Sequence, residues 1–181
     1  MYSYKYTTNL LNSALIVDKL GLSSGEHLAD FGCGRSGAFT FLAARTVGKH
    51  GLVYAVDIIK DHLVLIDREA KEYNLANIKT IWADLEKSQS TRLSSNSLDV
   101  VLIINTLHQI KDPENTIQEA YRILKKDGRL LIIDWTRAAS PLSPDQKIEK
   151  QSLLDYCTET GLSLHQQFMA GKHHYALIFI K

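Results

Sequence analysis

Three closely spaced glycines and one aspartate point most directly to chemistry in this sequence. Gly32, Gly34 and Gly37 follow a short apolar run and precede a segment with helical spacing. Glycine has no Cβ, so the backbone can turn sharply there and approach a ligand closely. The helix that follows would present free N–H groups and the positive end of its dipole. Twenty residues after Gly37 stands Asp57, whose carboxylate can accept hydrogen bonds from a ribose diol. The pattern therefore predicts a site for a nucleoside-containing cofactor.

The sequence of this loop fits two alternative cofactors. The spacing from Gly32 to Gly37, with Asp57 after it, is the dinucleotide fingerprint of oxidoreductases. A dinucleotide would place its pyrophosphate against the loop, where Asp30 would repel it. That carboxylate suits a cationic ligand instead, such as an ammonium beside a sulfonium. We therefore expect S-adenosylmethionine (SAM), with an NAD-linked oxidoreductase as the less favoured alternative.

Alternating hydrophobic periods predict the elements that position this loop. Strand-like apolar runs alternate with segments of helical spacing, which implies right-handed crossovers and a mainly parallel sheet with helices on both faces. The expected strands are His27–Phe31, Leu52–Asp57, Ile78–Trp82, Leu98–Ile104 and Arg129–Trp135. The expected helices are Thr8–Leu20, Gly37–Val47, Lys60–Tyr73, Asp112–Lys126 and a segment within Pro144–Thr160.

The helix expected over Asp112–Lys126 has the clearest boundary signals. Asp112 can cap its amino end and Pro113 suits the first helical position. Lys125 and Lys126 would complement the dipole at the other end, and Gly128 would allow a left-handed exit.

The carboxyl-terminal part of the chain breaks the strand–helix alternation. Two further strand-like runs, Leu162–Met169 and Tyr175–Ile180, are joined by a loop too short for a helix, so they must be antiparallel or lie on separate edges. We expect seven strands with the last one reversed. His173 and His174 lie in this hairpin and would point to opposite faces, so we expect surface residues rather than a metal pair.

Length and composition exclude several classes of protein. A chain of 181 residues with 45% hydrophobic and 23% charged residues is typical of one compact domain over 1–181. The net charge of +1 favours neither nucleic acid nor an anionic membrane. No apolar stretch approaches the roughly 20 residues that cross a bilayer, and the first residues do not resemble a signal peptide. Cys33 and Cys157 offer no disulfide framework, so we expect a reducing cytoplasm.

Taken together, the motifs resemble those of class I SAM-dependent methyltransferases, close to the ubiquinone/menaquinone-biosynthesis type (the methyltransferase type 11 group). The resemblance covers nearly the whole chain, from Asn9 to Lys181. The segments that carry it, in chain order, are Ala29-Asp-Phe-Gly-Cys-Gly34, Val53-Tyr-Ala-Val-Asp57, Ile81-Trp-Ala-Asp84, Leu98–Asn105, Leu107–Pro113 and Leu124–Ile133. It implies an α/β, Rossmann-like fold whose seven-stranded, mainly parallel sheet has an antiparallel last strand. Ser36 stands where the family usually has a third glycine.

The resemblance also implies roles for individual residues, all at strand ends or in the loops that follow them. Asp30, with the loop Gly32, Cys33 and Gly34, would hold the methionine part of SAM. Asp57 would bind the ribose hydroxyls, Ile58 and Ala83 would pack against the adenine, and Asp84 would accept a hydrogen bond from its amine. Asn105 would face the methionine near the transferable methyl.

Each assignment has a simpler alternative. Asp57 and Asp84 could be helix caps or solvated loop acids, but their placement after consecutive strands favours the cofactor interpretation. Asn105 could be an ordinary turn residue. Cys33 lies in the loop as a small packing residue rather than a nucleophile, because nothing nearby in the sequence activates its thiolate.

The catalytic and acceptor sites carry weaker signals. His108 is the candidate general base by location, and a packing or capping histidine is an equal alternative. Tyr2, Tyr4 and Tyr6 could form a lid over the site or an ordered tail on the surface. We expect a small-molecule acceptor. A protein or nucleic-acid acceptor stays open, and so does a SAM-binding module without catalysis. Two cysteines are too few for an arsenite-type enzyme, and the sequence predicts no metal site and no oligomeric state.

Overall fold

The computed structural model describes residues 11–136 and 149–181 of the chain. Tyr2, Tyr4 and Tyr6 lie outside the described residues, as do the first residues of the helix expected over Thr8–Leu20. The start of the segment expected within Pro144–Thr160 lies outside them too.

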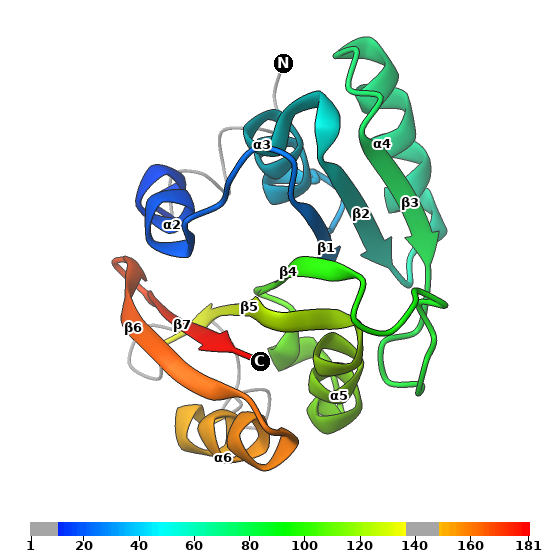
Figure 1. The fold of residues 1–181 in the computed structure, drawn as a ribbon. Helices are drawn as coiled ribbons and strands as arrows, with labels where there is room; N and C mark the ends of the chain where they lie inside the picture. The colour runs from blue at the N-terminus through cyan, green and yellow to red at the C-terminus, as the bar shows by residue number, and fades with distance from the viewer. Residues whose placement is uncertain (1–10, 137–148) are drawn as a thin grey trace.

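A seven-stranded sheet forms the centre of the molecule (Figure 1). Its order is β3-β2-β1-β4-β5-β7-β6, and every neighbouring pair up to β5 is parallel. The strands are β1 (His27–Phe31), β2 (Leu52–Asp57), β3 (Ile78–Trp82), β4 (Leu98–Ile104), β5 (Leu124–Trp135), β6 (Ser163–Gly171) and β7 (His174–Ile180). β7 is antiparallel to both β5 and β6. This confirms the predicted fold class, with its seven strands and reversed last strand.

The strand register brings the carboxyl ends of the parallel strands to one edge of the sheet. Asp57 at the end of β2 pairs with Trp82 at the end of β3, and parallel β1 and β4 flank β2 on the other side. Because β7 runs in the opposite direction, its first residue, His174, pairs with Trp135 at the end of β5. The carboxyl ends of five parallel strands and the start of β7 therefore share an edge, where open α/β sheets bind ligands.

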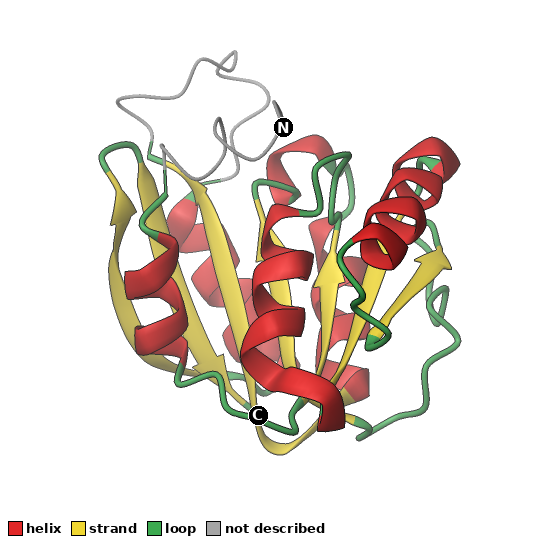
Figure 2. Cartoon of the chain, turned by 90° about the horizontal axis from the view of Figure 1, so that it is seen from above, coloured by secondary structure: helices red, strands yellow, loops and turns green. Residues whose placement is uncertain are grey.

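Helices cover both faces of the sheet (Figure 2). The helices α2 (Ser13–Leu20), α3 (Ala38–Val47) and α4 (Lys60–Glu72) pack on one face. The helices α5 (Pro113–Ile123) and α6 (Lys150–Thr160) pack on the other. Central strands are buried on both sides, which explains their nearly continuous apolar sequences.

The end of α5 differs from the prediction. Asp112 caps the helix by accepting a hydrogen bond from the Asn115 backbone N–H at 3.3 Å, as expected. The helix ends at Ile123, however, because Leu124 is fully buried and already pairs with Leu98 as a strand. Lys125 and Lys126 therefore belong to β5 rather than to the helix.

The left-handed turn after α5 falls on Asp127, with φ of 63°, and not on Gly128. Gly128 is required for a different reason. A Cβ there would lie 2.8 Å from the Lys125 carbonyl oxygen, so close approach of the backbone excludes a side chain.

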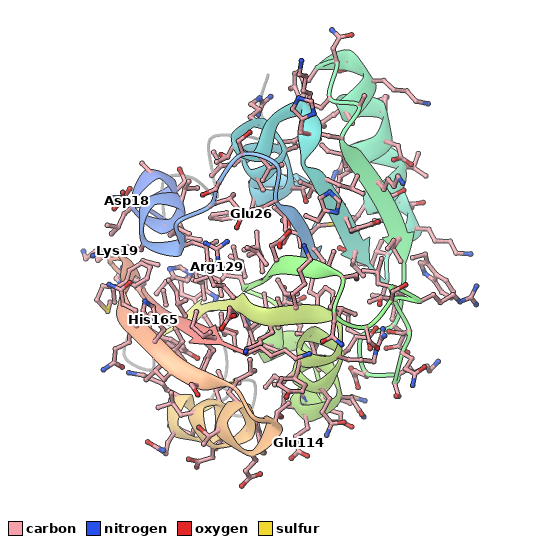
Figure 3. The ribbon with its side chains drawn as sticks, viewed as in Figure 1. Asp18, Lys19, Glu26, Glu114, Arg129 and His165 are labelled. Carbon is pink, nitrogen blue, oxygen red and sulfur yellow. The ribbon has the colours of Figure 1, made fainter. Side chains whose placement is uncertain are left out.

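One arginine ties the amino-terminal helix to the sheet. Arg129 in β5 donates to the carbonyl oxygens of Leu20 and Gly21 at 2.6 and 2.8 Å, and it pairs with Glu26 just before β1 (Figure 3). Gly21 ends α2 in the left-handed conformation. The guanidinium thus satisfies helix-end carbonyls that have no partner within the helix.

Within the described ranges, no helix has the length and apolar character needed to span a membrane.

Candidate functional site

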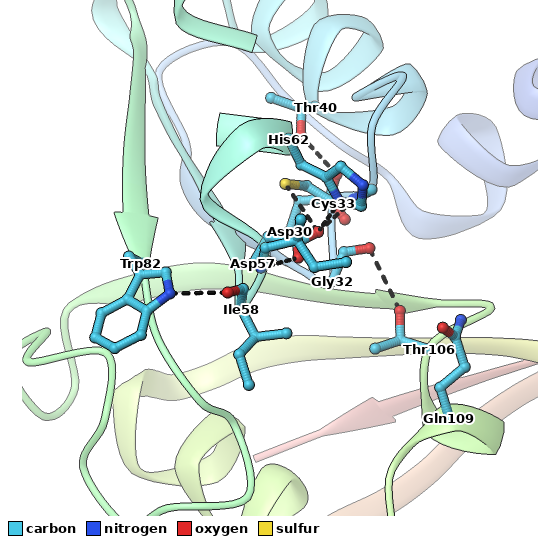
Figure 4. A network of polar contacts seen from close by, with 12 residues as sticks. Asp30, Gly32, Cys33, Thr40, Asp57, Ile58, His62, Trp82, Thr106 and Gln109 are labelled. Atoms are coloured by element: carbon cyan, nitrogen blue, oxygen red, sulfur yellow. Dashed lines mark hydrogen bonds and ion pairs between the residues drawn. The ribbon is translucent and has the colours of Figure 1, made fainter. Parts of the chain in front are cut away.

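A cavity of about 230 Å³ opens at the carboxyl edge of the sheet. It lies between the loops that follow β1, β2, β3 and β4 (Figure 4). Its lining residues are Gly32, Gly34, Asp57, Ile58, Ile59, His62, Ala83, Asp84, Leu85, Glu86, Thr106, Gln109 and Ile110. Six residues predicted to bind a cofactor are among them: Gly32, Gly34, Asp57, Ile58, Ala83 and Asp84.

The three glycines of the loop all adopt the left-handed conformation, and an added Cβ would meet different surroundings at each. A Cβ on Gly32, with φ of 71°, would collide with the Thr106 side chain. A Cβ on Gly37 would lie 3.1 Å from atoms of Ile66 and Phe41. A Cβ on Gly34, with φ of 66°, would meet no protein atom within 4 Å. Gly34 is therefore the point where a ligand can approach the backbone.

Thr106, which follows β4, fixes the glycine loop in place. Its hydroxyl lies 3.2 Å from the Phe31 carbonyl oxygen and 3.4 Å from that of Gly32. On the opposite side, the N–H groups of Gly32 and Cys33 both donate to the Val56 carbonyl oxygen, at 2.8 and 3.1 Å. The sequence did not predict Thr106, because its contacts with the glycine loop join residues more than 70 positions apart.

Asp57 is the most heavily bonded acid of the cavity. Its Oδ1 accepts from the Ile59 N–H at 2.9 Å, and its Oδ2 accepts from the Gly34 N–H at 2.9 Å. His62 Nδ1 lies 3.2 Å from the same Oδ2 (Figure 4). His62 was not predicted, although its place five residues after Asp57, in the first turn of α4, was the available signal.

The residues after β2 and β3 form the opposite wall of the cavity. Ala83 is buried, whereas the Ile58 side chain is 55% exposed. Trp82 Nε1 donates to the Ile58 carbonyl oxygen at 2.8 Å, which joins the ends of the two strands (Figure 4). Asp84 Oδ1 accepts from the Glu86 N–H at 3.2 Å, and Asp84 Oδ2 lies 3.2 Å from Lys87 Nζ.

Two predicted residues, Asp30 at the end of β1 and Cys33 in the glycine loop, do not line the cavity. Asp30 is 2% exposed and accepts a hydrogen bond from the Thr40 hydroxyl at 2.7 Å. Burial raises the pKa of Asp30 to about 6. Burial also raises the pKa of the Cys33 thiol far above its usual range, and its Sγ lies 3.9 Å from Asp57 Oδ2.

Asn105 and His108 also stand beside the cavity rather than in its wall. Asn105 follows β4 in a left-handed conformation with φ of 53°, and its N–H donates to the Ile133 carbonyl oxygen at 2.8 Å. His108 Nδ1 lies 2.9 Å from Oδ1 of Asp134, near the end of β5. Asp134 was not predicted. It is 2% exposed, and its carboxylate also accepts from the backbone N–H groups of His108 and Trp135.

The prediction of surface positions for both hairpin histidines is wrong for His174, which is fully buried. The reason is topological, because β7 lies between β5 and β6 rather than at the edge of the sheet. The His174 ring packs on the Trp135 ring, with the centroids 4.1 Å apart. No three His, Cys, Asp or Glu side chains gather as a metal site in the described part of the chain.

Comparisons of the sequence with a family model and with known proteins agree on one family. The family model described as "Methyltransferase domain" matches residues 22–175. Demethylmenaquinone methyltransferase of Lactobacillus johnsonii is 29% identical over 124 residues, which are 68% of this chain and 50% of that protein. Arsenite methyltransferase of Aquipseudomonas alcaligenes is 30% identical over 139 residues, covering 73% of this chain and 40% of that protein. The chain thus spans half or less of the length of these relatives.

A solved structure shows the same fold over almost the whole chain. The SAM-dependent methyltransferase from Aquifex aeolicus superposes with a TM-score of 0.86 at 20% identity. The match covers 97% of this chain and 93% of that one. The edge of the sheet and the glycine loop described above therefore belong to a fold already seen in a crystal structure.

Proposed function

The chain belongs to the methyltransferase-domain family, and on that premise we propose that it transfers a methyl group from SAM to a small-molecule acceptor. The observation that carries the proposal is the cavity at the strand ends. Asp57 and Asp84 line it from two consecutive strands, and Gly34 opens it to a ligand. A cavity lined by these two acids and by Glu86 favours a ligand with cationic and hydrogen-bond-donating groups over a pyrophosphate.

The donors and acceptors present fit the adenosyl part of SAM. Asp57 would accept from the ribose hydroxyls, and Asp84 from the adenine amine. Ile58 and Ala83 would provide apolar surface for the adenine ring. The buried Asp30 behind the loop would attract the ammonium of the methionine part, together with the backbone of Gly32 and Gly34.

When bound, SAM would supply a methyl group on a sulfonium, which is a good leaving group. The protein then needs mainly to hold the acceptor atom in line with that methyl, because positioning alone supplies much of the rate. Asn105 would act on the methionine side of the site, next to Thr106 and the cavity.

His108 is the general base that we propose for acceptors that must lose a proton. A carboxylate only accepts hydrogen bonds, so the contact with Asp134 requires the proton of His108 to be on Nδ1. Nε2 then carries the lone pair that can take a proton. Asp134 is the positioning residue that fixes this tautomer.

The proposal of a small-molecule acceptor rests on the relatives, whose names give demethylmenaquinone and arsenite as substrates. Arsenite is the less favoured of the two, since Cys33 and Cys157 are both buried and unpaired thiols. Those unpaired thiols also support our expectation of a reducing compartment.

Calorimetric titration with SAM and with its product S-adenosylhomocysteine (SAH) tests the proposal. We expect binding of both by the wild type and by Asp18→Ala, a control on the exposed face of α2, and loss of binding by Asp57→Ala. Transfer of a labelled methyl group into the small-molecule fraction of a cell extract would then show catalysis. A wild-type chain that takes up neither ligand would contradict the proposal. Binding without labelled product would support a SAM-binding module instead.

A further inference from the structure

A second cavity lies at the opposite edge of the sheet from the cavity at the strand ends. Its volume is about 610 Å³, which is within the roughly 300–1,000 Å³ typical of small-molecule sites. It opens between the ends of α3 and α4 and the amino ends of β2 and β3, where the arrows of these strands begin in Figure 1. We call it the amino-edge groove, and its lining residues are Ala44, Arg45, Gly48, Lys49, Gly51, Leu52, Asn74, Leu75, Ala76 and Asn77.

The lining of the amino-edge groove combines apolar side chains with two cations. Leu52 and Leu75, with two alanines, supply the apolar part. Lys49 and Arg45 supply positive charge, and both residues are exposed. Among the described residues that line the groove, none carries a carboxylate. A ligand that matches this lining has an apolar body and an anionic group.

Lys49 is the cation of the groove that a ligand can reach. None of the ion pairs among the described residues involves Lys49. The guanidinium carbon of Arg45 lies 5.2 Å from the centroid of the Tyr73 ring, and this stacking holds the second cation in place. Glu26 is bonded to the groove through its backbone, but its carboxylate pairs with Arg129. We therefore assign the main contact with a bound anion to Lys49.

The carbonyl oxygens at the end of α3 would oppose an anion if they had no partners. Asn77 Nδ2 donates to the carbonyl oxygens of Ala44 and Gly48 at 2.8 and 2.9 Å. The Val47 carbonyl oxygen accepts from the Gly25 N–H at 2.8 Å. Because protein donors already pair with these carbonyls, the negative end of the helix is partly neutralised beside the groove.

We propose that the amino-edge groove binds an organic anion with an apolar body, whose charged group pairs with Lys49 and Arg45. The apolar body packs on Leu52 and Leu75. The groove and Asp57 lie at opposite ends of the six-residue strand β2, roughly 17 Å apart. The site is therefore separate from the one proposed for methyl transfer, and it takes its ligand whether the cofactor cavity is empty or filled.

Three probes with the same alkyl chain test the requirement for negative charge: octanoate, octanol and octylammonium. Amide NMR shifts both locate and measure the binding of each. Gly48 and Gly51 report on the groove, and Gly34 reports on the cavity at the strand ends. We expect octanoate to shift the groove amides and to bind about tenfold more tightly than octanol, because it adds one charge-assisted contact. Octylammonium should bind more weakly than octanol.

Two variants change the charge of the groove. Lys49→Gln should weaken octanoate binding several-fold and leave the affinity for octanol unchanged, which also shows that the groove is intact. Ala76→Glu places a carboxylate at an exposed position of the lining, so octylammonium should then bind more tightly than octanoate. Lys19→Gln, on the exposed side of α2 (Figure 3), loses the same charge outside the groove. It is the matched control and should bind octanoate like the wild type.

Equal affinity of the wild type for octanoate and octylammonium would overturn the inference, and so would shifts confined to Gly34. No binding of any probe, or an unchanged octanoate affinity in Lys49→Gln, would overturn it too. None of these results bears on the proposed function, which the titrations with SAM and SAH test separately.

Discussion

Asp57 has fewer free lone pairs than recognition of a ribose diol requires. A carboxylate offers about four acceptor positions. The N–H groups of Gly34 and Ile59 and the ring of His62 contact this one, and so does the weaker donor Cys33 Sγ at 3.9 Å. The two backbone donors are fixed by the loop. His62 is a side chain that can rotate, so it is the donor that a second ribose hydroxyl would displace.

Replacement of His62 should therefore strengthen cofactor binding. We expect His62→Leu to bind SAH several-fold more tightly than the wild type, because the ligand no longer competes for Asp57 Oδ2. Calorimetric titration measures the change. Arg68→Leu, at an exposed position on the same helix, is the control and should leave the affinity as it is. Weaker binding by His62→Leu would show that the imidazole contacts the ligand favourably.

The buried Asp30 should make stability depend on pH. Its pKa is about 6 in the folded chain against an ordinary value of 3.8, so the folded state binds the proton more tightly. The ionised carboxylate therefore destabilises the fold above about pH 6, and this cost disappears as the pH falls towards 3.8.

Chemical unfolding of the wild type and Asp30→Asn at two pH values tests the direction of this pH dependence. Relative to the variant, the wild type should gain about 1 kcal/mol of stability between about pH 7 and about pH 5. The asparagine can still accept the hydrogen bond from Thr40 and cannot titrate. A constant difference between the two proteins would mean that Asp30 does not take up a proton in this range.

The His108–Asp134 pair should affect catalysis without affecting cofactor binding. We expect His108→Asn to slow transfer of labelled methyl on the order of a hundredfold, the usual contribution of a general base. Asp134→Asn should also slow it, because an amide can donate to Nδ1 and stabilise the wrong tautomer. The SAH affinity, measured by calorimetry, should be unchanged in both. Full activity in His108→Asn would remove the histidine from the mechanism.

Whether the sequence could predict a site residue depends on whether the contacts of that residue are local. The places of Asp57, Ala83 and Asp84 in the cavity wall could be predicted, because each ends a strand with a clear apolar run or stands within two residues of its end. Thr106 and Asp134 could not, since their roles depend on contacts between segments that only the sheet order brings together. His174 was misplaced for the same reason, because a hairpin alone does not reveal that its second strand lies inside the sheet. The contact of His62 with Asp57 spans only five residues, so the sequence did contain a signal for it.

At the scale of elements, the glycine loop shows how one turn serves both the fold and the site. Gly32 is packed against Thr106, whereas Gly34 faces open space. Both are left-handed, so alanine is strained by about 1 kcal/mol or more at either position. Only at position 32 does the added methyl group also collide with the protein.

Alanine substitutions should separate these two roles. Gly32→Ala should lose about 1–3 kcal/mol more stability in urea unfolding than Gly34→Ala, because overpacking adds to the strain. Gly34→Ala should lose most of its SAH affinity while staying folded, because its methyl group would point into the cavity. Equal loss of stability in the two variants would contradict this division of roles.

The element boundaries follow a similar logic. The five parallel strands begin or end close to their predicted positions because their apolar runs are buried on both faces. The end of α5 was predicted too late, since Lys125 and Gly128 are good helix-end signals in isolation. Pairing of Leu124 with Leu98 overrides those local preferences, and no local pattern reports it.

In the molecule as a whole, no single helix, strand or loop forms the site. Its lining comes from loops after β1, β2, β3 and β4, which belong to segments separated by up to about half the chain. In the unfolded chain these groups are apart, so a ligand binds the folded state almost exclusively. Binding must then stabilise the entire fold rather than one loop.

Thermal unfolding measures how much a bound ligand stabilises the fold. SAH at a hundred times its dissociation constant should add about 2.7 kcal/mol to the free energy of unfolding. For a chain of this length that corresponds to a rise in Tm of about 5–10 °C. Asp57→Ala, which loses the proposed ribose acceptor, should show no rise at the same concentration, and Asp18→Ala should behave like the wild type. A rise in Tm that persists in Asp57→Ala would mean that SAH stabilises the chain from a site other than the cavity at the strand ends.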